Sequence, residues 1–580
     1  MYYVSPTGSD SNAGSKTSPF KSLERAVEET RKQSIAHKKI MLLSGTYPST
    51  YVVLDQRDNG LRIQGDPTGS TVLRGGVQPG SWKESGRGLY CTPLPTGTDP
   101  DVRILEINGE FKPRTRFPKT GFATHSSRFA PAWVSTTGGG FETMPTDRER
   151  SQLTYAPGVV PEDFTWQDTE ITIMHKWDES LVKIKSHDAS TRTVNLASMT
   201  GNPPGSFGVY EFALWNSAYG MEPGQFRVDK TNRLLYYMPL PWEDMSTAST
   251  WLPQQSSIIN FAGPVQNISI KDISFMTTAS PLVDIIYIRE QIPNTYGAIG
   301  VTGAIECDGG LKDCVFGNLR FGNIGGWGIR INGKSENIRI EGCSIQNAGA
   351  GGIRIEDGEG CTVKGCTIDN TGLVHYSGIG IYVSGCDVIE NAVSNTTYTG
   401  ISYGKGDGGQ ILRNRVKAAM TVLNDGAGIY VTFCENGTMS GNIVEDVPLG
   451  SPSQRHGLYI DEQANGWVVE GNITLNCPSA MLCHMCYREG NIIRNNIFAS
   501  HAGDIQLSLI RCKNHVLENN TFHAAGKVEF AGNRGAIASF EGNRIYSEAK
   551  QVSQMYINDD YSKESPVAID MTAGNVNPLG

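Results

Sequence analysis

An asparagine recurs through the second half of the sequence, and this repeat restricts the fold more than any other feature. It holds the same place in seven consecutive segments, with spacings of 23 to 30 residues, at Asn391, Asn414, Asn442, Asn472, Asn496, Asn520 and Asn543. A segment of this length cannot bury a hydrophobic core alone, so neighbouring copies must stack on one another. The repeat therefore predicts a solenoid.

Each repeat contains short runs of alternating apolar and polar residues, and no run is long enough for a helix. Parallel strands stacked about 4.8 Å apart satisfy both observations. An asparagine at the same turn of every coil then forms a hydrogen-bonded ladder, so we assign these asparagines a structural role. We predict an all-β fold, with a right-handed parallel β-helix over about residues 255–545.

The first 254 residues divide into two parts. Residues 19–27 have the apolar spacing of a short amphipathic helix covering the end of the stack, and strands are expected at 40–43 and 61–63. Residues 76–254 differ, because they hold seven of the nine tryptophans and strand pairs such as 170–174 and 234–238. We predict three units: 1–75, the N-terminal cap and first coils; 76–254, an inserted antiparallel β-sandwich-like domain; and 255–580, the β-helix with a catalytic groove.

Composition limits the partners. A formal net charge of -9 argues against nucleic acid, and no stretch approaches the roughly 20 apolar residues of a membrane span. The N-terminal residues run into a turn at 6–10 and do not resemble a signal peptide. Either the protein is cytoplasmic or a leader has been removed, and of the two we expect a secreted or periplasmic location.

The twelve cysteines are dispersed, and most are expected to pack as small hydrophobes. Cys483 and Cys486 have the spacing of half a zinc site, but a second pair at metal spacing is missing. We expect no bound metal and no cofactor.

A second pattern indicates which side chains face solvent. Segments of the form Gly-Ile-x-Ile-x recur, and their second and fourth members are mostly apolar. Because side chains alternate along a strand, the third and fifth members must point outward. The outward residues are then Arg354, Ser402, Tyr430, Tyr459 and Gln506, beside Glu356, Tyr382, Thr432, Asp461, His484 and Ser508. Tyrosines, an acid and a histidine in adjacent coils indicate the floor of a groove.

Three carboxylates near this face are the candidate catalytic residues. Asp461 lies on its strand, Glu462 follows it, and Asp425 precedes Gly428 by three residues in the neighbouring coil. Glycoside hydrolysis needs such a pair, in which one carboxyl protonates the leaving oxygen and the other attacks the sugar or activates water. Taken singly, Asp425 also fits an ordinary turn and Asp461 a solvated strand end.

Candidate substrate-binding residues surround the carboxylates. His484 is expected to hydrogen-bond sugar hydroxyls or to tune a neighbouring carboxyl, and His375 and His456 to line the side of the groove. Tyr430 and Tyr459 are expected to stack on sugar rings. The full set is His484, His375, His456, Tyr430, Tyr459, Tyr382 and Glu356.

Segments outside these columns resemble a group of carbohydrate-active proteins. Residues 3–10, followed by Pro19-Phe20, are similar to the opening of many carbohydrate-active parallel β-helix proteins. Residues 107–118 resemble the start of an insertion typical of one subset, and residues 223–239 resemble its end. The motifs of that subset are also similar to 425–430, 457–462 and 484–497.

This combination resembles glycoside hydrolase family 141, whose members include α-L-fucosidases and a xylanase. The resemblance covers nearly the whole chain and implies a glycosidase for plant or algal poly- or oligosaccharide, with α-L-fucoside or β-xyloside as the expected linkage. It implies Asp425 and Asp461 as the catalytic pair and Glu462 as the reserve. In the related β-xylosidases of glycoside hydrolase family 120 the carboxylates lie on neighbouring coils, whereas here the coil after Asp461 carries His484.

Two other functions stay open on this scaffold. A polysaccharide lyase or uronate epimerase must neutralise a substrate carboxylate with Ca²⁺ or basic side chains, and the outward columns contain only Arg354, with Arg455 and Arg488 in nearby loops. A non-catalytic adhesin or phage-type fibre would hold glycan in the same groove without cleaving it. The acidic cluster favours the hydrolase.

Overall fold

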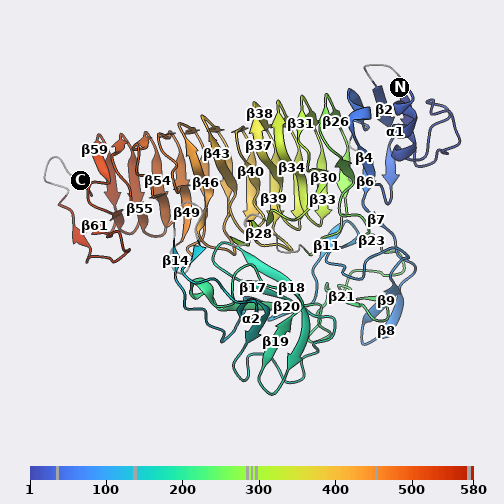
Figure 1. The fold of residues 1–580 in the computed structure, drawn as a ribbon, viewed down its shortest axis with the longest axis horizontal. Helices are drawn as coiled ribbons and strands as arrows, with labels where there is room; N and C mark the ends of the chain where they lie inside the picture. Colours follow the sequence, from blue (N-terminus) through green and yellow to red (C-terminus); the bar gives the residue numbers. More distant parts are fainter. Residues whose placement is uncertain are drawn as a thin grey trace.

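The structure is a computed structural model that describes residues 1–33, 38–68, 70–134, 140–282, 287–288, 292–293, 298–450, 454–570 and 577–579. The chain is all-β and forms a long parallel β-helix (Figure 1). A domain of antiparallel strands lies along one side of the helix. The predicted fold class and the predicted parallel stack are both confirmed.

Three parallel sheets form the walls of the helix, and within the described ranges they have 13, 14 and 16 strands. One sheet runs from β1 (Tyr2–Val4) to β59 (Ile537–Glu541), and another runs from β3 (Gly45–Tyr47) to β60 (Arg544–Ser547). β5 (Leu61–Gln64) pairs in parallel with β26 (Ser269–Lys271). Residues on both sides of the inserted segment therefore build one continuous stack.

The third sheet carries the outward residues discussed above. Its strands include β4 (Val52–Leu54), β24 (Ile259–Phe261), β30 (Gly303–Cys307), β34 (Trp327–Glu336), β37 (Ile353–Glu359), β40 (Ile381–Val383), β43 (Ile401–Asp407), β46 (Gly426–Glu435), β49 (Arg455–Ile460), β52 (Ser479–His484), β55 (Ile505–Ile510), β58 (Val528–Gly532) and β61 (Val552–Tyr556). Tyr430 of β46 aligns with Tyr459 of β49, and Ile429 aligns with Leu458. The aliphatic pair lies in the core and the tyrosines lie on the outer face.

The register differs from the sequence alignment at two coils. Tyr382 pairs with Arg354, and Ser508 pairs with Leu482, so each lies one column away from its expected place. Both shifts arise where the regular strand pairing is interrupted. A loop precedes β40, and the pairing of β52 with β55 shifts register after Ser479.

A continuous core fills the helix, and the predicted asparagine ladder runs beside it. The Asn414 side-chain amide donates to Asn442 Oδ1 at 3.0 Å, and Asn442 donates in turn to Asn472 Oδ1 at 2.9 Å. The same bond links every consecutive pair from Asn391 to Asn543. The structural role of these asparagines is confirmed.

The helix α1 (Leu23–Arg31) covers the N-terminal end of the stack. It begins after Ser22, whose side chain accepts a hydrogen bond from the Arg25 N–H, and it buries Leu23 and Val27 against the first coils. The helix starts later than predicted because Phe20 bridges to Val4 and continues the first coil.

The inserted segment is antiparallel, as expected, and contains two packed units. Two four-stranded sheets, which include β10 (Leu105–Ile107) and β22 (Leu234–Tyr237), share one core. A larger sheet centred on β17 (Glu170–Met174), β18 (Glu179–Asp188) and β20 (Glu211–Trp215) has a core of its own.

Buried polar contacts attach this larger sheet to the helix. Arg103 donates to Glu170 Oε2 at 2.9 Å and to the Ser280 carbonyl at 2.8 Å. Glu179 Oε2 accepts the Ser377 N–H at 2.9 Å. These bonds attach the first residue of β17, through Arg103, and the first residue of β18 to connecting segments of the β-helix. No helix among the described residues is long and apolar enough to cross a membrane.

Candidate active site

Asp461 directly follows β49, and side chains from the coils on both sides converge on its carboxylate. Tyr430, on β46, donates its hydroxyl to Asp461 Oδ2 at 2.8 Å. His484, at the end of β52, places Nδ1 2.8 Å from Asp461 Oδ1. Both oxygens are thereby held in a defined orientation, and the residue is only 9% exposed.

The other nitrogen of His484 contacts a residue that the repeat did not reveal. Nε2 lies 2.9 Å from the hydroxyl of Tyr561, which belongs to the segment after β61. The Arg511 guanidinium lies over the Tyr561 ring, 4.4 Å from its centroid. An ionised carboxylate only accepts hydrogen bonds, so Nδ1 is the donor whenever the Asp461 carboxylate is ionised, and the Tyr561 hydroxyl can either donate to Nε2 or accept from it.

Asp425, the second predicted catalytic residue, directly precedes β46 and forms an ion pair with the inserted domain. Lys176 lies in the turn between β17 and β18, and its Nζ is 2.8 Å from Asp425 Oδ2. The neighbouring Asn424 N–H donates to the Lys176 carbonyl at 3.0 Å. Burial alone would raise the pKa of Asp425, but the charge and hydrogen bond of Lys176 reverse this effect and lower it.

The local backbone brings the two carboxylates to one side of the sheet. Ala427 and Tyr430 belong to the same outer cluster although they are three residues apart, so the strict alternation of side chains is broken between them. Gly428 lies at this break, and a Cβ atom there would be 2.3 Å from Val444 Cγ1. The charges of Asp425 and Asp461 both act on His456 and Tyr459, so the two carboxylates lie around the same buried side chains.

His456 and Tyr459 form the buried floor between the carboxylates. His456 Nδ1 lies 2.6 Å from Ser479 Oγ, and its ring packs against Tyr459 with centroids 4.9 Å apart. Burial lowers the pKa of His456 to about 4, although the negative charges of Asp425 and Asp461 oppose the shift. Burial, reinforced by the same two carboxylates, raises the pKa of Tyr459. Both side chains are therefore neutral near pH 7.

The expected stacking role of the two tyrosines is not compatible with their burial. Tyr430 is 8% exposed and Tyr459 is 3% exposed. Their rings pack against each other at 5.0 Å and against Leu482 of the next coil. Neither ring offers a free face to a sugar, and what Tyr430 presents to the site is its hydroxyl.

Three further predicted binding residues have other surroundings. Tyr382 is buried beneath the Arg354 guanidinium, 4.0 Å from its ring centroid. Glu356 pairs with Arg354 and lines a shallow depression on the outer face of the helix. His375 is buried with Nε2 3.2 Å from Ser280 Oγ, at the contact with the inserted domain. The inserted domain and the shifted register set the environment of these three residues, whose partners are other than Asp425 and Asp461.

Two more acidic residues lie near the pair. Glu462, the reserve candidate, is partly exposed directly after Asp461. Glu211 of β20 lies close enough to Arg455 for their charges to interact, and burial raises the pKa of Glu211. Arg455 itself donates to Asn424 Oδ1 at 3.0 Å, beside Asp425. Glu211 has no repeat pattern around it, so only the tertiary structure reveals it.

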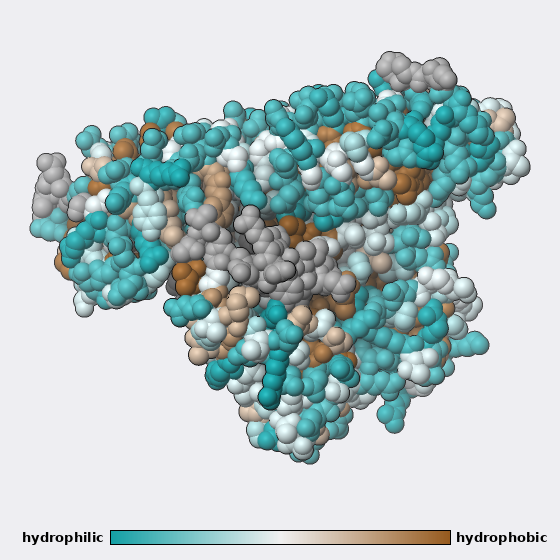
Figure 2. Space-filling view, in the orientation of Figure 1, coloured by the Kyte–Doolittle hydropathy of each residue, from teal (hydrophilic) through white to brown (hydrophobic). Residues whose placement is uncertain are grey.

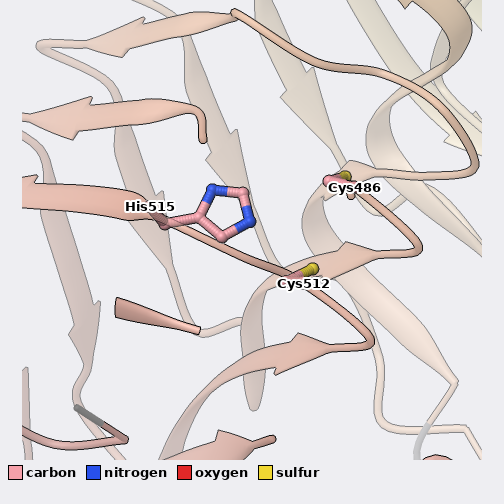
Figure 3. A group of neighbouring side chains, drawn as sticks. All are labelled: Cys486, Cys512 and His515. Atoms are coloured by element: carbon pink, nitrogen blue, oxygen red, sulfur yellow. The ribbon is translucent and has the colours of Figure 1, made fainter. Parts of the chain in front are cut away.

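Cys486, Cys512 and His515 form the one group in the described ranges whose ligand-type atoms lie close enough to hold a metal ion (Figure 3). All three are buried. His515 Nδ1 accepts the Asn491 N–H at 2.9 Å, so the single proton of the neutral ring lies on Nε2. Nε2 then has no lone pair for a metal, and the group does not suit zinc. We interpret it as core packing, in which the Nε2–H group faces the two sulfurs.

The comparisons with known proteins agree on the scaffold. The family model "Right handed beta helix region" matches residues 300–422 and 418–560. A solved structure described as a glycoside hydrolase is 18% identical, with a TM-score of 0.66, over 86% of this chain and 96% of its own. At this identity the likeness shows the fold alone.

Two other structural neighbours are a complex with a sugar and a glycoside hydrolase. XylC in complex with xylose is 12% identical, with a TM-score of 0.49, over 96% of this chain and 88% of its own. The lacto-N-biosidase of glycoside hydrolase family 136 from Eubacterium ramulus is 11% identical, with a TM-score of 0.41, over 94% of this chain and 67% of its own.

Proposed function

We propose that the protein is a glycoside hydrolase that cleaves plant or algal poly- or oligosaccharide, with α-L-fucosides and β-xylosides as the first substrates to test. One observation carries the proposal. Two carboxylates from adjacent coils, Asp425 and Asp461, act on the same buried His456 and Tyr459. They have different partners, a lysine for Asp425 and a histidine for Asp461. Glycoside hydrolysis needs two carboxyl groups in different protonation states. The glycoside hydrolase with the same fold supports this reading.

Asp425 takes the role of the ionised carboxylate. The Lys176 ammonium lowers its pKa, so Asp425 remains an anion through the acidic range in which many glycosidases work. An anion beside the sugar either attacks the anomeric carbon or removes a proton from the attacking water. Lys176 is a positioning residue in this scheme, because it acts through Asp425.

Asp461 and His484 together supply the proton. When the pair carries the proton to be donated, that proton lies between Oδ1 and Nδ1, and the Nε2–H group donates to the Tyr561 hydroxyl. After the proton has left, Nδ1–H donates to ionised Asp461, and Nε2 accepts from Tyr561. The proton passes from this pair to the leaving glycosidic oxygen. Water then restores it from solvent.

The lyase and epimerase alternatives gain little from the structure. Two cations border the site, but Lys176 is occupied by Asp425, and Arg455 donates to the Asn424 side chain and the Val422 carbonyl. Neither is left over to neutralise a uronate. A purely binding function does not require two carboxylates with different partners, a lysine for one and a histidine for the other.

The first experiment is a substrate screen with the full chain. It uses p-nitrophenyl α-L-fucoside, p-nitrophenyl β-xyloside and plant and algal polysaccharides, and it measures reducing sugar together with the ultraviolet absorbance of unsaturated uronates. Release of reducing sugar without that absorbance supports the hydrolase. Appearance of the absorbance favours the lyase.

A leaving-group series then separates the two roles. Asp461→Asn should lose about 10²- to 10⁴-fold on a poor leaving group, such as a sugar, but much less on a dinitrophenyl glycoside, which needs no protonation. Asp425→Asn should lose activity on both substrates alike. Asp446→Asn is the matched control, because Asp446 lies in the same coil but pairs with Lys417 on another sheet. Full activity of both site variants would falsify the proposal.

A further inference from the structure

The inserted domain carries a cluster of aromatic rings that takes no part in the hydrogen bonds of the site. Trp177 packs against Phe207 with ring centroids 4.5 Å apart, and against Trp133 at 5.3 Å. Trp133, on β14 (Trp133–Val134), packs against Phe141, on β15 (Gly140–Phe141), at 5.0 Å. All four side chains are partly exposed. We call these four residues the aromatic platform.

The aromatic platform borders Asp425. Trp177 follows Lys176 in the chain, and Lys176 Nζ lies 5.8 Å from the centre of the Trp177 ring and 2.8 Å from Asp425 Oδ2. The carboxylate and the indole therefore flank the same ammonium group. β14 lies below β49 in Figure 1, and Figure 2 shows apolar surface atoms at that edge of the inserted domain.

Packing alone does not account for these rings. Trp177 contacts the helix core, but Trp133, Phe141 and Phe207 belong to none of the hydrophobic cores of the described residues. Apolar rings left partly in water beside polar groups mark a binding surface. The interplanar angles between the platform rings range from 34° to 85°, so these rings meet in tilted or edge contacts and do not stack face to face on one another.

We infer that the aromatic platform binds a further pyranose ring of the glycan, one that the cleaved bond does not join. One face of a pyranose presents C–H groups that suit an aromatic face. The inserted domain thus contributes affinity for substrates longer than one sugar. This inference rests on the proposed function, and it names the substrate class as oligo- or polysaccharide rather than a simple glycoside.

The test compares a long and a short substrate. Trp177→Ala and Trp133→Ala should each raise KM for an oligosaccharide, xylotetraose or a fucosylated oligosaccharide, by about tenfold, and leave KM for the matching p-nitrophenyl monoglycoside within about twofold. Trp242→Ala is the matched control, since Trp242 is 75% exposed in the same inserted segment and lies outside the platform. Thermal unfolding checks that each variant folds. If Trp177→Ala does not fold, Trp133→Ala alone provides the test.

A binding measurement distinguishes failure of this inference from failure of the proposed function. Asp461→Asn is titrated with the same oligosaccharides while tryptophan fluorescence is followed. If the parent protein hydrolyses none of these glycans, but the fluorescence change occurs and Trp133→Ala abolishes it, the platform is supported and the hydrolase is rejected. Hydrolysis with unchanged oligosaccharide KM in both tryptophan variants rejects the platform and leaves the hydrolase standing. No binding of any of these glycans rejects both.

Discussion

Lys176 Nζ, in the inserted domain, lies 2.8 Å from Asp425 Oδ2, at the edge of the β-helix. The contact joins two parts of the chain that are far apart in sequence and sets the charge of a predicted catalytic residue. The inserted domain is therefore part of the site, since it supplies the cation and the aromatic platform beside it.

Loss of the Lys176 cation should change the pH dependence of activity. In Lys176→Met the pKa of Asp425 rises, because burial is no longer opposed by the ammonium charge. Asp425 then becomes protonated at a higher pH, so the acidic limb of the kcat/KM profile should move to higher pH, with roughly tenfold lower activity below the optimum. Lys183→Met, which removes a partner of Asp101 in the same domain, is the control. An unshifted acidic limb would contradict the role given to Lys176.

Removal of the Tyr561 hydroxyl should weaken catalysis modestly. Tyr561→Phe leaves His484 Nε2 without its partner, and a neutral hydrogen bond contributes about 1 kcal/mol, or roughly a fivefold change in kcat. The loss should be larger for poor leaving groups, because the Asp461–His484 pair supplies the proton. Tyr546→Phe, at an exposed position near His523, should have no effect. Equal losses across all leaving groups would show that Tyr561 acts on binding instead.

Substitution of an asparagine in the middle of the ladder should lower the stability of the protein more than substitution at its end. Asn442→Ala removes hydrogen bonds with Asn414 and Asn472, and also the bond to the Ile411 carbonyl, all of them buried. Unsatisfied buried groups cost about 1–3 kcal/mol each, so we expect a loss of about 3 kcal/mol or more, measured as a lower thermal midpoint. Asn543→Ala, at the partly exposed last rung, should cost clearly less. Equal effects at both rungs would argue against a ladder.

Glu179 should make the protein less stable at alkaline pH. Burial raises its pKa from 4.5 to about 8, with the neighbouring Asp178 adding to the shift. Below pH 4.5 both folded and unfolded chains hold the proton, whereas between pH 4.5 and 8 only the folded chain does, so stability falls as pH rises through this window. Glu179→Gln removes the titration.

The stability of Glu179→Gln relative to the parent should therefore increase from pH 5 to pH 8. Melting temperatures of both proteins at the two pH values provide the measurement. Glu110→Gln is a suitable control, because the Glu110 carboxylate is 66% exposed in the same domain. A difference that does not grow with pH would mean that Glu179 is ionised in the folded state.

The sequence determined the scaffold because the scaffold is local and repetitive. The spacing of the asparagines sets the length of each coil, and the alternation around Ile429 and Leu458 decides which residues enter the core. A stacked repeat contacts only its neighbours, so the same short pattern predicts every layer. The convergence of Asp461 and His484 on one face followed from this logic, because they belong to adjacent coils.

The tertiary structure alone decided the surroundings of those residues. Lys176 and Tyr561 come from outside the repeats, and no spacing in the sequence relates them to Asp425 or His484. Coil length also varies, which moved Tyr382 one column from its expected place. Burial of the Tyr459 ring depends on neighbouring coils, so exposure could not be inferred from alternation. The repeat thus specifies a surface of candidate groups, whereas their charge and access depend on long-range contacts that no local pattern encodes.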